Sequence, residues 1–368
     1  MLVVFDALNI YYLPQFLPVF RELKRAGHQS CFVCYLKKNK KRLFEPVFKQ
    51  LGVDCHWVKS DKEAADLYGE LKPDWIIFGN RFQHLDQVHR HSKTAQMGHG
   101  VGSKPCYYHD SSAPMTVRFM EGKLRLAKIR ELYPLDNFTQ VGFSKLDPLF
   151  NGQEPGLDFS GLGLDPSRET ILYAPTFNPS SLECFPDDWP AEFDKYNILI
   201  KPHSLTTTRK RYWKQQAKLR KWARFPNVHV GGEEHFSLLP FMKDADIMLS
   251  DASSAVFEFA ALGRPIIICN FFKLKWSYRG PFRYRFERRF RRDNVLFDDL
   301  GIHVEKYEDL IEAIPAQLSS PEQFEEDRKR YTLDHVGETD GKASKRIVDY
   351  LEKWEKHPPG IRHGMSPV

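Results

Sequence analysis

Several features that define specialised protein classes are scarce or missing in this sequence. No apolar run approaches the ~18 to 20 residues that a membrane-spanning helix needs. The N-terminus has no basic stretch ahead of an apolar core, because Met1 leads straight into the segment LVVFDALNI. A secretory signal is therefore not expected. These absences predict a protein located in the cytoplasm.

Cysteine is also sparse, with six residues dispersed over 368 positions. Most of them lie inside apolar runs, as reduced thiols do in cytosolic proteins. Cys31 and Cys34 have the spacing of a redox or zinc pair, but they lie in an expected strand, where alternation points them to opposite faces. His84, His89 and His91 cluster without the spacing of a zinc motif. Neither a disulfide framework nor a metal site is predicted.

The composition is otherwise that of a globular protein with a well-filled interior. Apolar residues make up 42% of the chain and aromatic residues 14%, which argues against disorder. A chain of 368 residues exceeds one ordinary core and suits two domains of roughly 150 to 200 residues each.

Residues 1–150 alternate short apolar runs with helical patterns. The expected strands are 2–7, 29–36, 55–58, 74–80, 93–100 and 137–150, and the expected helices are 13–25, 41–51 and 62–71. Repeated strand–helix units of this kind are typical of a parallel sheet with helices on both faces. The segment 151–167 is rich in Gly, Pro and Asp and lacks periodicity, so we expect it to be a linker.

A second alternating series fills residues 168–356. Its expected strands are 169–176, 196–203, 227–232, 245–250 and 265–271, with helices near 208–224, 235–243 and 254–262. We therefore predict an α/β protein with two Rossmann-like, doubly wound domains that face a cleft. Open parallel sheets bind ligands at the carboxyl ends of their strands, so the loops after these strands are where chemistry is expected.

A last helix is expected near the end of the second domain. Ala343, Ile347, Leu351 and Trp354 recur at intervals of four, four and three residues. This spacing puts them on one helical face and indicates core packing. The remaining residues, 357–368, are expected to form a mobile tail.

The stretch ADIMLSDASSAVFEFAALGRPIIIC is the most informative for function. A strand ends, turn and cap residues follow, a short apolar helix begins after Ser254, and Gly263 ends it. The N–H groups at this helix start lie beside the hydroxyls of Ser253 and Ser254, and they suit a diphosphate because the helix dipole also favours anions. Capping of a buried helix by Asp251 and the serines is the alternative interpretation.

The same stretch carries a family resemblance, and four other motifs agree with it in order along the chain. DASSAVFEFAALGRPII resembles the D-x-S-S-x-x-x-(D/E) motif of the CDP-glycerol glycerophosphotransferases, which assemble teichoic acids and some capsules. The other matches are GHGVGSK at 98–104 for HG-x-x-x-K, ILYAPTF at 171–177 for LYAPTW, IKPHS at 200–204 for HPH, and DGKASKRI at 340–347 for DG-x-A-x-x-R-I. The resemblance covers residues 90–350.

The resemblance implies the glycosyltransferase-B fold, in agreement with the two alternating series. It implies that His99 is the base that deprotonates the acceptor, since an imidazole titrates near neutral pH, and that His203 holds donor phosphate oxygens. On the residues alone, a structural hydrogen bond remains the alternative for both. Glu258, where many relatives have Asp, is expected to hold the ribose hydroxyls. The other expected donor-binding residues are Lys104, Thr176, Lys201 (which replaces the first histidine of HPH), Ser204, Asp251, Ser253, Ser254 and Arg346.

Positive charge is concentrated in one segment. Nine Lys or Arg residues and a single acid, Glu287, lie between Lys273 and Arg292, whereas the net charge of the whole chain is +6. Arginines alternate with aromatic rings there, which suits nucleic acid, an anionic membrane surface or a polyanionic glycan. Because no nucleic-acid motif accompanies the segment, we predict docking at an anionic membrane or lipid-linked acceptor, and no nucleic-acid partner. The expected docking residues are Trp276, Arg283, Arg285, Arg288, Arg289, Arg291 and Arg292.

The resulting hypothesis is a transferase at the inner face of the cell membrane. It moves glycerol phosphate from CDP-glycerol, or a related nucleotide donor, to a hydroxyl of a lipid-linked or anionic glycan acceptor and releases CMP. Positioning and charge stabilisation carry such a displacement; no cofactor is required, and Mg²⁺ is an optional counter-ion. The alternatives are a nucleotide-sugar glycosyltransferase or 2-epimerase of the same fold, and a non-catalytic protein that docks on a membrane or polyanion.

Overall fold

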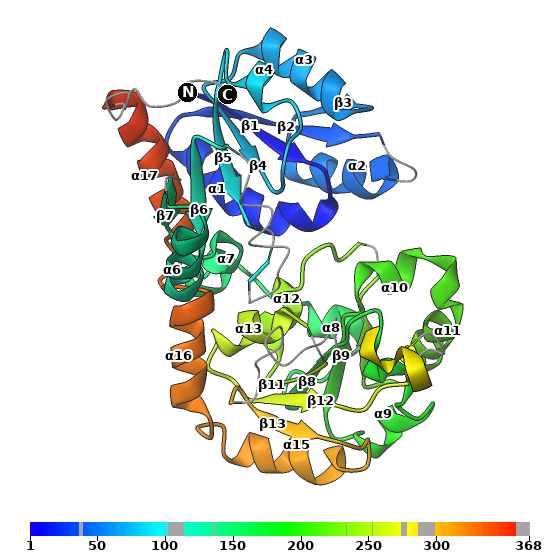
Figure 1. The fold of residues 1–368 in the computed structure, drawn as a ribbon. Coiled ribbons are helices and arrows are strands. Elements are labelled where there is room, and N and C mark those ends of the chain that lie inside the picture. The colour runs from blue at the N-terminus through cyan, green and yellow to red at the C-terminus, as the bar shows by residue number, and fades with distance from the viewer. Residues whose placement is uncertain are drawn as a thin grey trace.

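The protein, seen in a computed structural model, consists of two lobes joined along one side (Figure 1). The structure describes residues 1–36, 40–98, 100–101, 114–134, 137–232, 234–251, 253–273, 278–285 and 299–357. The first lobe is built on a seven-stranded sheet and the second on a six-stranded sheet. The pairings between the described strands are parallel. The predicted α/β fold with two doubly wound sheets is confirmed.

The first sheet has the strand order β3-β2-β1-β4-β5-β6-β7. Its strands are β1 (Leu2–Ala7), β2 (Gln29–Tyr35), β3 (Cys55–Val58), β4 (Trp75–Phe78), β5 (Lys93–Met97), β6 (Val117–Met120) and β7 (Phe138–Gln140). The chain begins in the centre, builds outward to β3, returns to β4 and builds outward again to β7. This reversal puts a topological switch point at the carboxyl ends of β1 and β4.

Helices cover both faces of the first sheet. Side chains alternate along each strand, so each strand contributes apolar side chains to a core on either face. Phe5 lies in the core on one face and Val4 in the core on the other. Cys34 belongs to the first of these cores and Cys31 borders the second, so their predicted opposite orientation is confirmed. The helical segments of this part of the chain are η1 (Ile10–Tyr12), α1 (Leu13–Arg25), α2 (Lys40–Leu51), α3 (Asp61–Leu71), α4 (Leu85–Val88), α6 (Lys123–Leu132), η3 (Ser144–Leu146) and α7 (Asp147–Phe150).

The second sheet has the order β10-β9-β8-β11-β12-β13. Its strands are β8 (Thr170–Ala174), β9 (Asn197–Ile200), β10 (Val228–Val230), β11 (Ile247–Ser250), β12 (Ile266–Cys269) and β13 (Ile302–Val304). The helical segments are α8 (Phe159–Leu162), η4 (Ser181–Glu183), α9 (Trp189–Glu192), α10 (Ser204–Thr208), η5 (Lys210–Tyr212), α11 (Trp213–Trp222), α12 (Leu239–Asp244), α13 (Ala255–Ala260), η7 (Gly280–Phe282), α15 (Leu310–Ser319) and α16 (Glu325–His335).

Each expected strand range contains a strand, although β7 occupies only the start of the range 137–150, whose last residues form η3 and α7. Two further strands were not predicted. β6 was missed because its sequence, VRFM, is short and contains Arg118, which is fully buried. β13 has three residues and includes His303. Strands this short give no alternation to detect.

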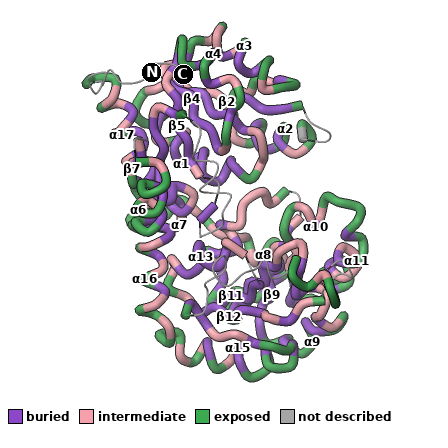
Figure 2. The backbone as a smooth tube through the Cα atoms, viewed as in Figure 1, coloured by how far each residue is buried: buried purple, intermediate pink, exposed green. Residues whose placement is uncertain are grey.

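The last helix, α17 (Ala343–Lys356), returns to the first lobe (Figures 1 and 2). Of its predicted apolar stripe, Ala343, Ile347 and Leu351 are each no more than 1% exposed, and Trp354 is partly buried against the same core. Ile347 and Leu351 complete the core that contains Phe5. The prediction that the second domain extends through this helix is therefore wrong, because the apolar face of α17 packs against the first sheet.

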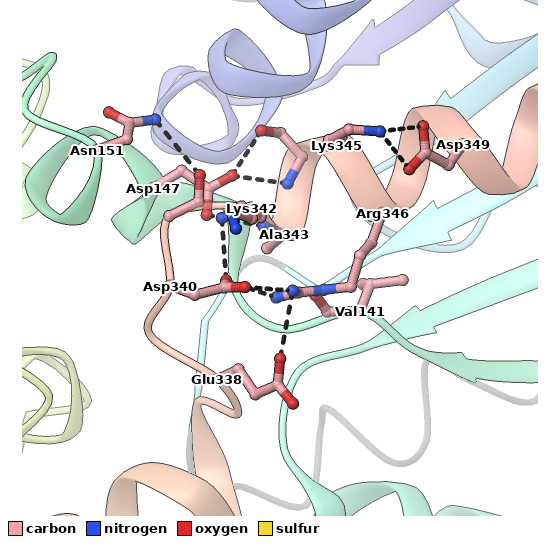
Figure 3. A network of polar contacts seen from close by, with 12 residues as sticks. Val141, Asp147, Asn151, Glu338, Asp340, Lys342, Ala343, Lys345, Arg346 and Asp349 are labelled. Atoms are coloured by element: carbon pink, nitrogen blue, oxygen red, sulfur yellow. Dashed lines mark hydrogen bonds and ion pairs between the residues drawn. The ribbon is translucent and has the colours of Figure 1, made fainter.

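The chain consequently crosses between the lobes twice, first after α7 and again between α16 and α17. The carboxylate of Asp147 anchors the second crossing (Figure 3). It accepts hydrogen bonds from the N–H of Ala343 at 3.0 Å and from the N–H and Oγ of Ser344 at 2.6 and 2.5 Å. Burial raises the pKa of Asp147, and these hydrogen bonds oppose that rise.

Candidate active site

A cavity of about 610 Å³ lies between the two lobes. Its second-lobe wall comes from the loops after β8, β9, β10 and β11, and its first-lobe wall includes η1 and the start of α1. The cavity therefore lies at the carboxyl ends of parallel strands, where such sheets bind ligands. The charged or titratable residues described in its wall are Lys145, Lys201, His203, Arg209, His235 and Glu258, together with Tyr11. Cations outnumber acids, which suits an anionic ligand.

His203 lines this cavity immediately after β9. It is the N-cap of α10, and its Nδ1 accepts a hydrogen bond from the N–H of Leu205 at 3.1 Å. The imidazole packs on the ring of Phe177, with 4.7 Å between ring centroids. Because Nδ1 is the acceptor, the neutral ring carries its proton on Nε2, which makes that atom a hydrogen-bond donor.

Lys201 and Ser204 flank His203 in the wall of the cavity. Burial lowers the pKa of Lys201 to about 8, while Glu234 raises it in part. None of the described residues accepts a hydrogen bond from the Lys201 ammonium. An ammonium held in a partly dehydrated wall without such a partner favours the binding of an anion.

Ser253 and Ser254 also lie in the cavity wall, between β11 and α13. The Ser253 Oγ accepts a hydrogen bond from the N–H of Ala255 at 3.3 Å. Ser254 is the N-cap residue of α13 but makes no side-chain capping bond. Ser253 therefore lines the cavity and also accepts a hydrogen bond from the start of α13. The Ser254 side chain lines the cavity without capping the helix.

Asp251 and Thr176 were predicted to bind the donor, and the structure corrects both assignments. Asp251 is fully buried and lies behind the cavity wall. Its carboxylate accepts hydrogen bonds from the N–H of Thr176 at 2.6 Å and from the N–H and Oγ of Ser181, both at 3.0 Å. The Thr176 hydroxyl donates to the carbonyl of Pro179 at 2.7 Å. Both side chains hold the loop after β8 in place, and its Phe177 reaches the cavity.

Arg346 is likewise a structural residue and does not line the cavity. Its guanidinium donates to the carbonyl of Val141 at 2.7 Å and forms ion pairs with Asp340 at 2.9 Å and Glu338 at 3.3 Å (Figure 3). The first of these bonds ties α17 to the end of β7. Arg346 was expected to contact the donor, but its guanidinium instead holds the start of α17 against the end of β7.

Glu258 lies in the cavity wall on α13 and is 3% exposed. Its Oε2 is 2.5 Å from the Nζ of Lys145, a residue of the first lobe. Sequence analysis missed Lys145. The only signal available was its position in the loop after β7, at the carboxyl end of a parallel strand.

His99 and Lys104 lie outside the described residues, but the neighbourhood of Gly98 is described. A Cβ at Gly98 would collide with the carboxylate of Glu121. Glu121 is buried in an ion pair with Arg125, with 2.6 Å between Oε2 and Nη1. Burial raises the pKa of Glu121, and Arg125 opposes that rise. A side chain at position 98 would therefore force this buried ion pair to shift.

Of the predicted docking residues, the structure describes two, Arg283 and Arg285, and both are exposed. The residues Trp276, Arg288, Arg289, Arg291 and Arg292 lie outside the described ranges. A second basic region was not predicted. Residues 209–224 contain eight Lys or Arg and no acid, and Trp213 within them is 60% exposed.

Within the described ranges, three or more His, Cys, Asp or Glu side chains do not gather in an arrangement that could hold a metal ion. In the same ranges, none of the helices is long and apolar enough to cross a membrane.

Comparison with known proteins identifies relatives by sequence. The model of a family described as CDP-glycerol:poly(glycerophosphate) glycerophosphotransferase matches residues 126–353. A teichoic acid glycerol-phosphate primase from Bacillus spizizenii is 22% identical over 255 residues. The match covers 64% of this chain and 58% of the primase, so the chain spans less than two thirds of that relative.

Solved structures show the same fold. The wall teichoic acid polymerase TagF has a TM-score of 0.68 and 16% identity, over 96% of this chain and 88% of that chain. A UDP-GlcNAc 2-epimerase from Neisseria meningitidis has a TM-score of 0.61 and 15% identity, over 96% of this chain and 99% of the epimerase. These likenesses confirm the glycosyltransferase-B fold, and because they include two different activities, the fold alone does not select between them.

Proposed function

The chain belongs to the CDP-glycerol:poly(glycerophosphate) glycerophosphotransferase family, and we propose that it transfers glycerol phosphate from CDP-glycerol to a hydroxyl of a lipid-linked or anionic glycan acceptor, releasing CMP. The resemblance read from the motifs is thus confirmed at the level of the family. The observation that carries the proposal is the cavity between the lobes, in which Lys201, His203, Ser253 and Ser254 line one wall.

The donor's diphosphate is assigned to this second-lobe wall. The Lys201 ammonium supplies charge, the Ser254 hydroxyl supplies a donor, and the Nε2–H of His203 can donate to a phosphate oxygen. Such groups stabilise charge that develops on phosphate oxygens during transfer. Ser204 lies beside His203 and adds a second hydroxyl to the wall. Glu258 is the single acid among the described wall residues, so we assign it to uncharged hydroxyl groups of the ligand.

The chemical step is a displacement at the β-phosphorus of the donor. An acceptor oxygen forms the new bond to this phosphorus while the bond to the bridging oxygen breaks, and CMP leaves with the bond electrons. His99 takes the acceptor's proton, and Lys104 balances phosphate charge from the first-lobe side. Both assignments rest on the motif GHGVGSK.

The nucleotide and the bond that breaks distinguish this proposal from its rivals. A nucleotide-sugar glycosyltransferase would release a nucleoside diphosphate, and a 2-epimerase would release UDP or leave the nucleotide sugar intact. The purified protein should therefore be incubated with CDP-activated and UDP-activated donors and an oligo(glycerol phosphate) acceptor. Release of CMP from CDP-glycerol supports the proposal, whereas turnover of UDP-sugars with no CMP release contradicts it.

We also propose that the protein docks peripherally on an anionic membrane at the inner face of the cell envelope. The surface formed by 209–224 supports this, because its exposed cations surround the exposed Trp213. Tryptophan favours the interface between headgroups and acyl chains, and each basic residue near an anionic leaflet contributes about 1 kcal/mol. Arg209 belongs to this surface and also lines the cavity.

Lys273, the first residue of the predicted docking segment, lies close to this basic surface. Burial lowers the pKa of Lys218 on α11, and Asp187 opposes this shift. The positive charge of Lys273 lowers the pKa of Lys218 further. Lys273 begins the predicted segment and is thus near enough to Lys218 to act on it. Docking through both regions would bring the cavity to the membrane, where a lipid-linked acceptor would be located.

A further inference from the structure

The Lys145–Glu258 pair joins the two lobes inside the cavity wall. Lys145 belongs to η3 of the first lobe and Glu258 to α13 of the second, 113 positions later. The side chain of Lys145 is 15% exposed and that of Glu258 is 4% exposed. An ion pair this well shielded from water is constrained in geometry, unlike pairs at the surface.

The pair leaves one carboxylate oxygen unused. Lys145 contacts Oε2 of Glu258, and no described residue donates a hydrogen bond to Oε1. Glu258 is nearly buried, but it lines the cavity. A carboxylate oxygen can only accept hydrogen bonds, so its partner in a bound ligand has to be a donor such as a hydroxyl group.

The position of Glu258 relative to the serines narrows the ligand chemistry. Glu258 lies four positions after Ser254, so the two side chains are neighbours on the same side of α13. A ligand whose phosphates contact Ser254 would place the groups adjoining the diphosphate near Glu258. In CDP-glycerol these are the ribose on one side and glycerol on the other, and each carries a vicinal pair of hydroxyls.

We propose that Lys145 is a positioning residue that fixes Oε2 of Glu258 so that Oε1 accepts hydrogen bonds from a vicinal diol adjoining the donor diphosphate. This inference rests on the proposed donor site. It makes the diol subsite dependent on both lobes, because the carboxylate comes from one lobe and the cation that orients it from the other.

The test compares ligands with and without the diol, using calorimetry on the intact protein. One arm measures CMP against 2′,3′-dideoxy-CMP, and the other measures CDP-glycerol against an analogue that carries a propyl group in place of glycerol. Hydrogen bonds to a charged group predict that the wild type favours the diol by about 10-fold to 100-fold in one arm. The arm that responds identifies the ribose or the glycerol as the diol.

Four variants distinguish a role of Lys145 in positioning the Glu258 carboxylate from a general effect on folding. Lys145→Met and Glu258→Gln should each reduce the preference to below about threefold, whereas Lys145→Arg keeps the cation and should retain most of it. Lys123→Met is the matched control. Lys123 forms another ion pair between α6 and α16, with Asp334 at 3.4 Å, but it is 63% exposed and does not line the cavity.

The outcomes are distinct. If Lys145→Met keeps the wild-type preference while Glu258→Gln loses it, or if the wild type shows no preference in either arm, the inference is overturned although the donor site stands. If neither CMP nor CDP-glycerol binds the wild type, the proposed donor site fails as well. Should Lys145→Met not fold, Lys145→Gln replaces it. Loss of the preference in Lys145→Gln with retention in Lys145→Arg supports the inference, whereas equal preference in these two variants, or equal loss in Lys123→Met, refutes it.

Discussion

Replacing Lys201 with methionine should stabilise the unliganded protein at neutral pH while it weakens donor binding. The ammonium lies in the cavity wall, and burial lowers its pKa from 10.5 to about 8. At about 1.4 kcal/mol for each pH unit, this difference corresponds to about 3 kcal/mol. Methionine has a similar length and removes the charge.

The sign of the pH dependence follows from proton binding. At pH 7 the folded and unfolded states both carry the proton, so the full cost of the buried charge is present. Between pH 8 and pH 10.5 the folded state loses its proton first, the unfolded state binds more protons, and the free energy of unfolding rises. The wild type should therefore approach the stability of Lys201→Met as the pH increases.

Urea denaturation at pH 7, 8, 9 and 10 measures this effect. Tryptophan fluorescence reports on the second lobe, since Trp189 and Trp222 are fully buried there. Lys201→Met should exceed the wild type by about 1 to 3 kcal/mol at pH 7, with the difference shrinking toward pH 10. In parallel, wild-type affinity for CDP-glycerol should fall as the pH rises through about 8, and the variant should bind weakly at every pH. A variant less stable at pH 7, or a difference that does not change with pH, would refute the reasoning.

Three further predictions follow from the site. Asp251→Asn should lower the free energy of unfolding by about 2 to 4 kcal/mol, because it disturbs the buried hydrogen bonds that anchor the loop after β8; an unchanged urea midpoint would argue against that anchor. Ser254→Ala should weaken CDP-glycerol binding by about 1 kcal/mol in calorimetry without changing stability, and an unchanged affinity would remove Ser254 from the donor site. The combined changes Arg211→Ser, Trp213→Ser and Lys214→Ser should reduce sedimentation with anionic vesicles, and wild-type binding should weaken with added salt; the changes Lys329→Ser and Arg330→Ser, which remove two exposed cations of α16, serve as the control, and equal loss in both would contradict docking at this surface.

The strands were the most predictable part of the molecule. Parallel strands buried on both faces have continuous apolar sequences, such as ILYA in β8 and IIIC in β12. β6 departs from this pattern because it buries Arg118, whose guanidinium lies 5.4 Å from the ring of Phe138. A charge that is buried against a residue on another strand looks in the sequence like a charge in solvent.

The candidate site was predictable where it depended on chain order and unpredictable where it depended on distant partners. Lys201, His203 and Ser254 lie in the cavity wall because the loops after strands meet there. Asp251 lies beside them in sequence, but its carboxylate turns away from the cavity to the loop that contains Ser181, 70 positions earlier. Neighbouring residues of one motif can therefore have different roles: Ser254 lines the cavity, whereas Asp251 stabilises a loop inside the protein.

The second crossing of the chain shows the same limit. The stripe on α17 predicted a buried face but did not identify the surface that covers it. Arg346 was assigned to an anion site because it is basic and lies in a family motif, whereas its guanidinium binds the carbonyl of Val141, 205 positions earlier. Partners this far apart follow from the packing of the two lobes and cannot be read from spacing.

The position of the bond that breaks in the donor tests the central claim most directly. CDP-glycerol labelled with ³²P in its β-phosphate should be incubated with the purified protein, anionic vesicles and a lipid-linked acceptor, and the products separated. The proposed displacement predicts label in the acceptor and unlabelled CMP in equal amounts. Label that stays with the nucleotide as CDP, or CDP-glycerol that is bound but never consumed, would contradict it.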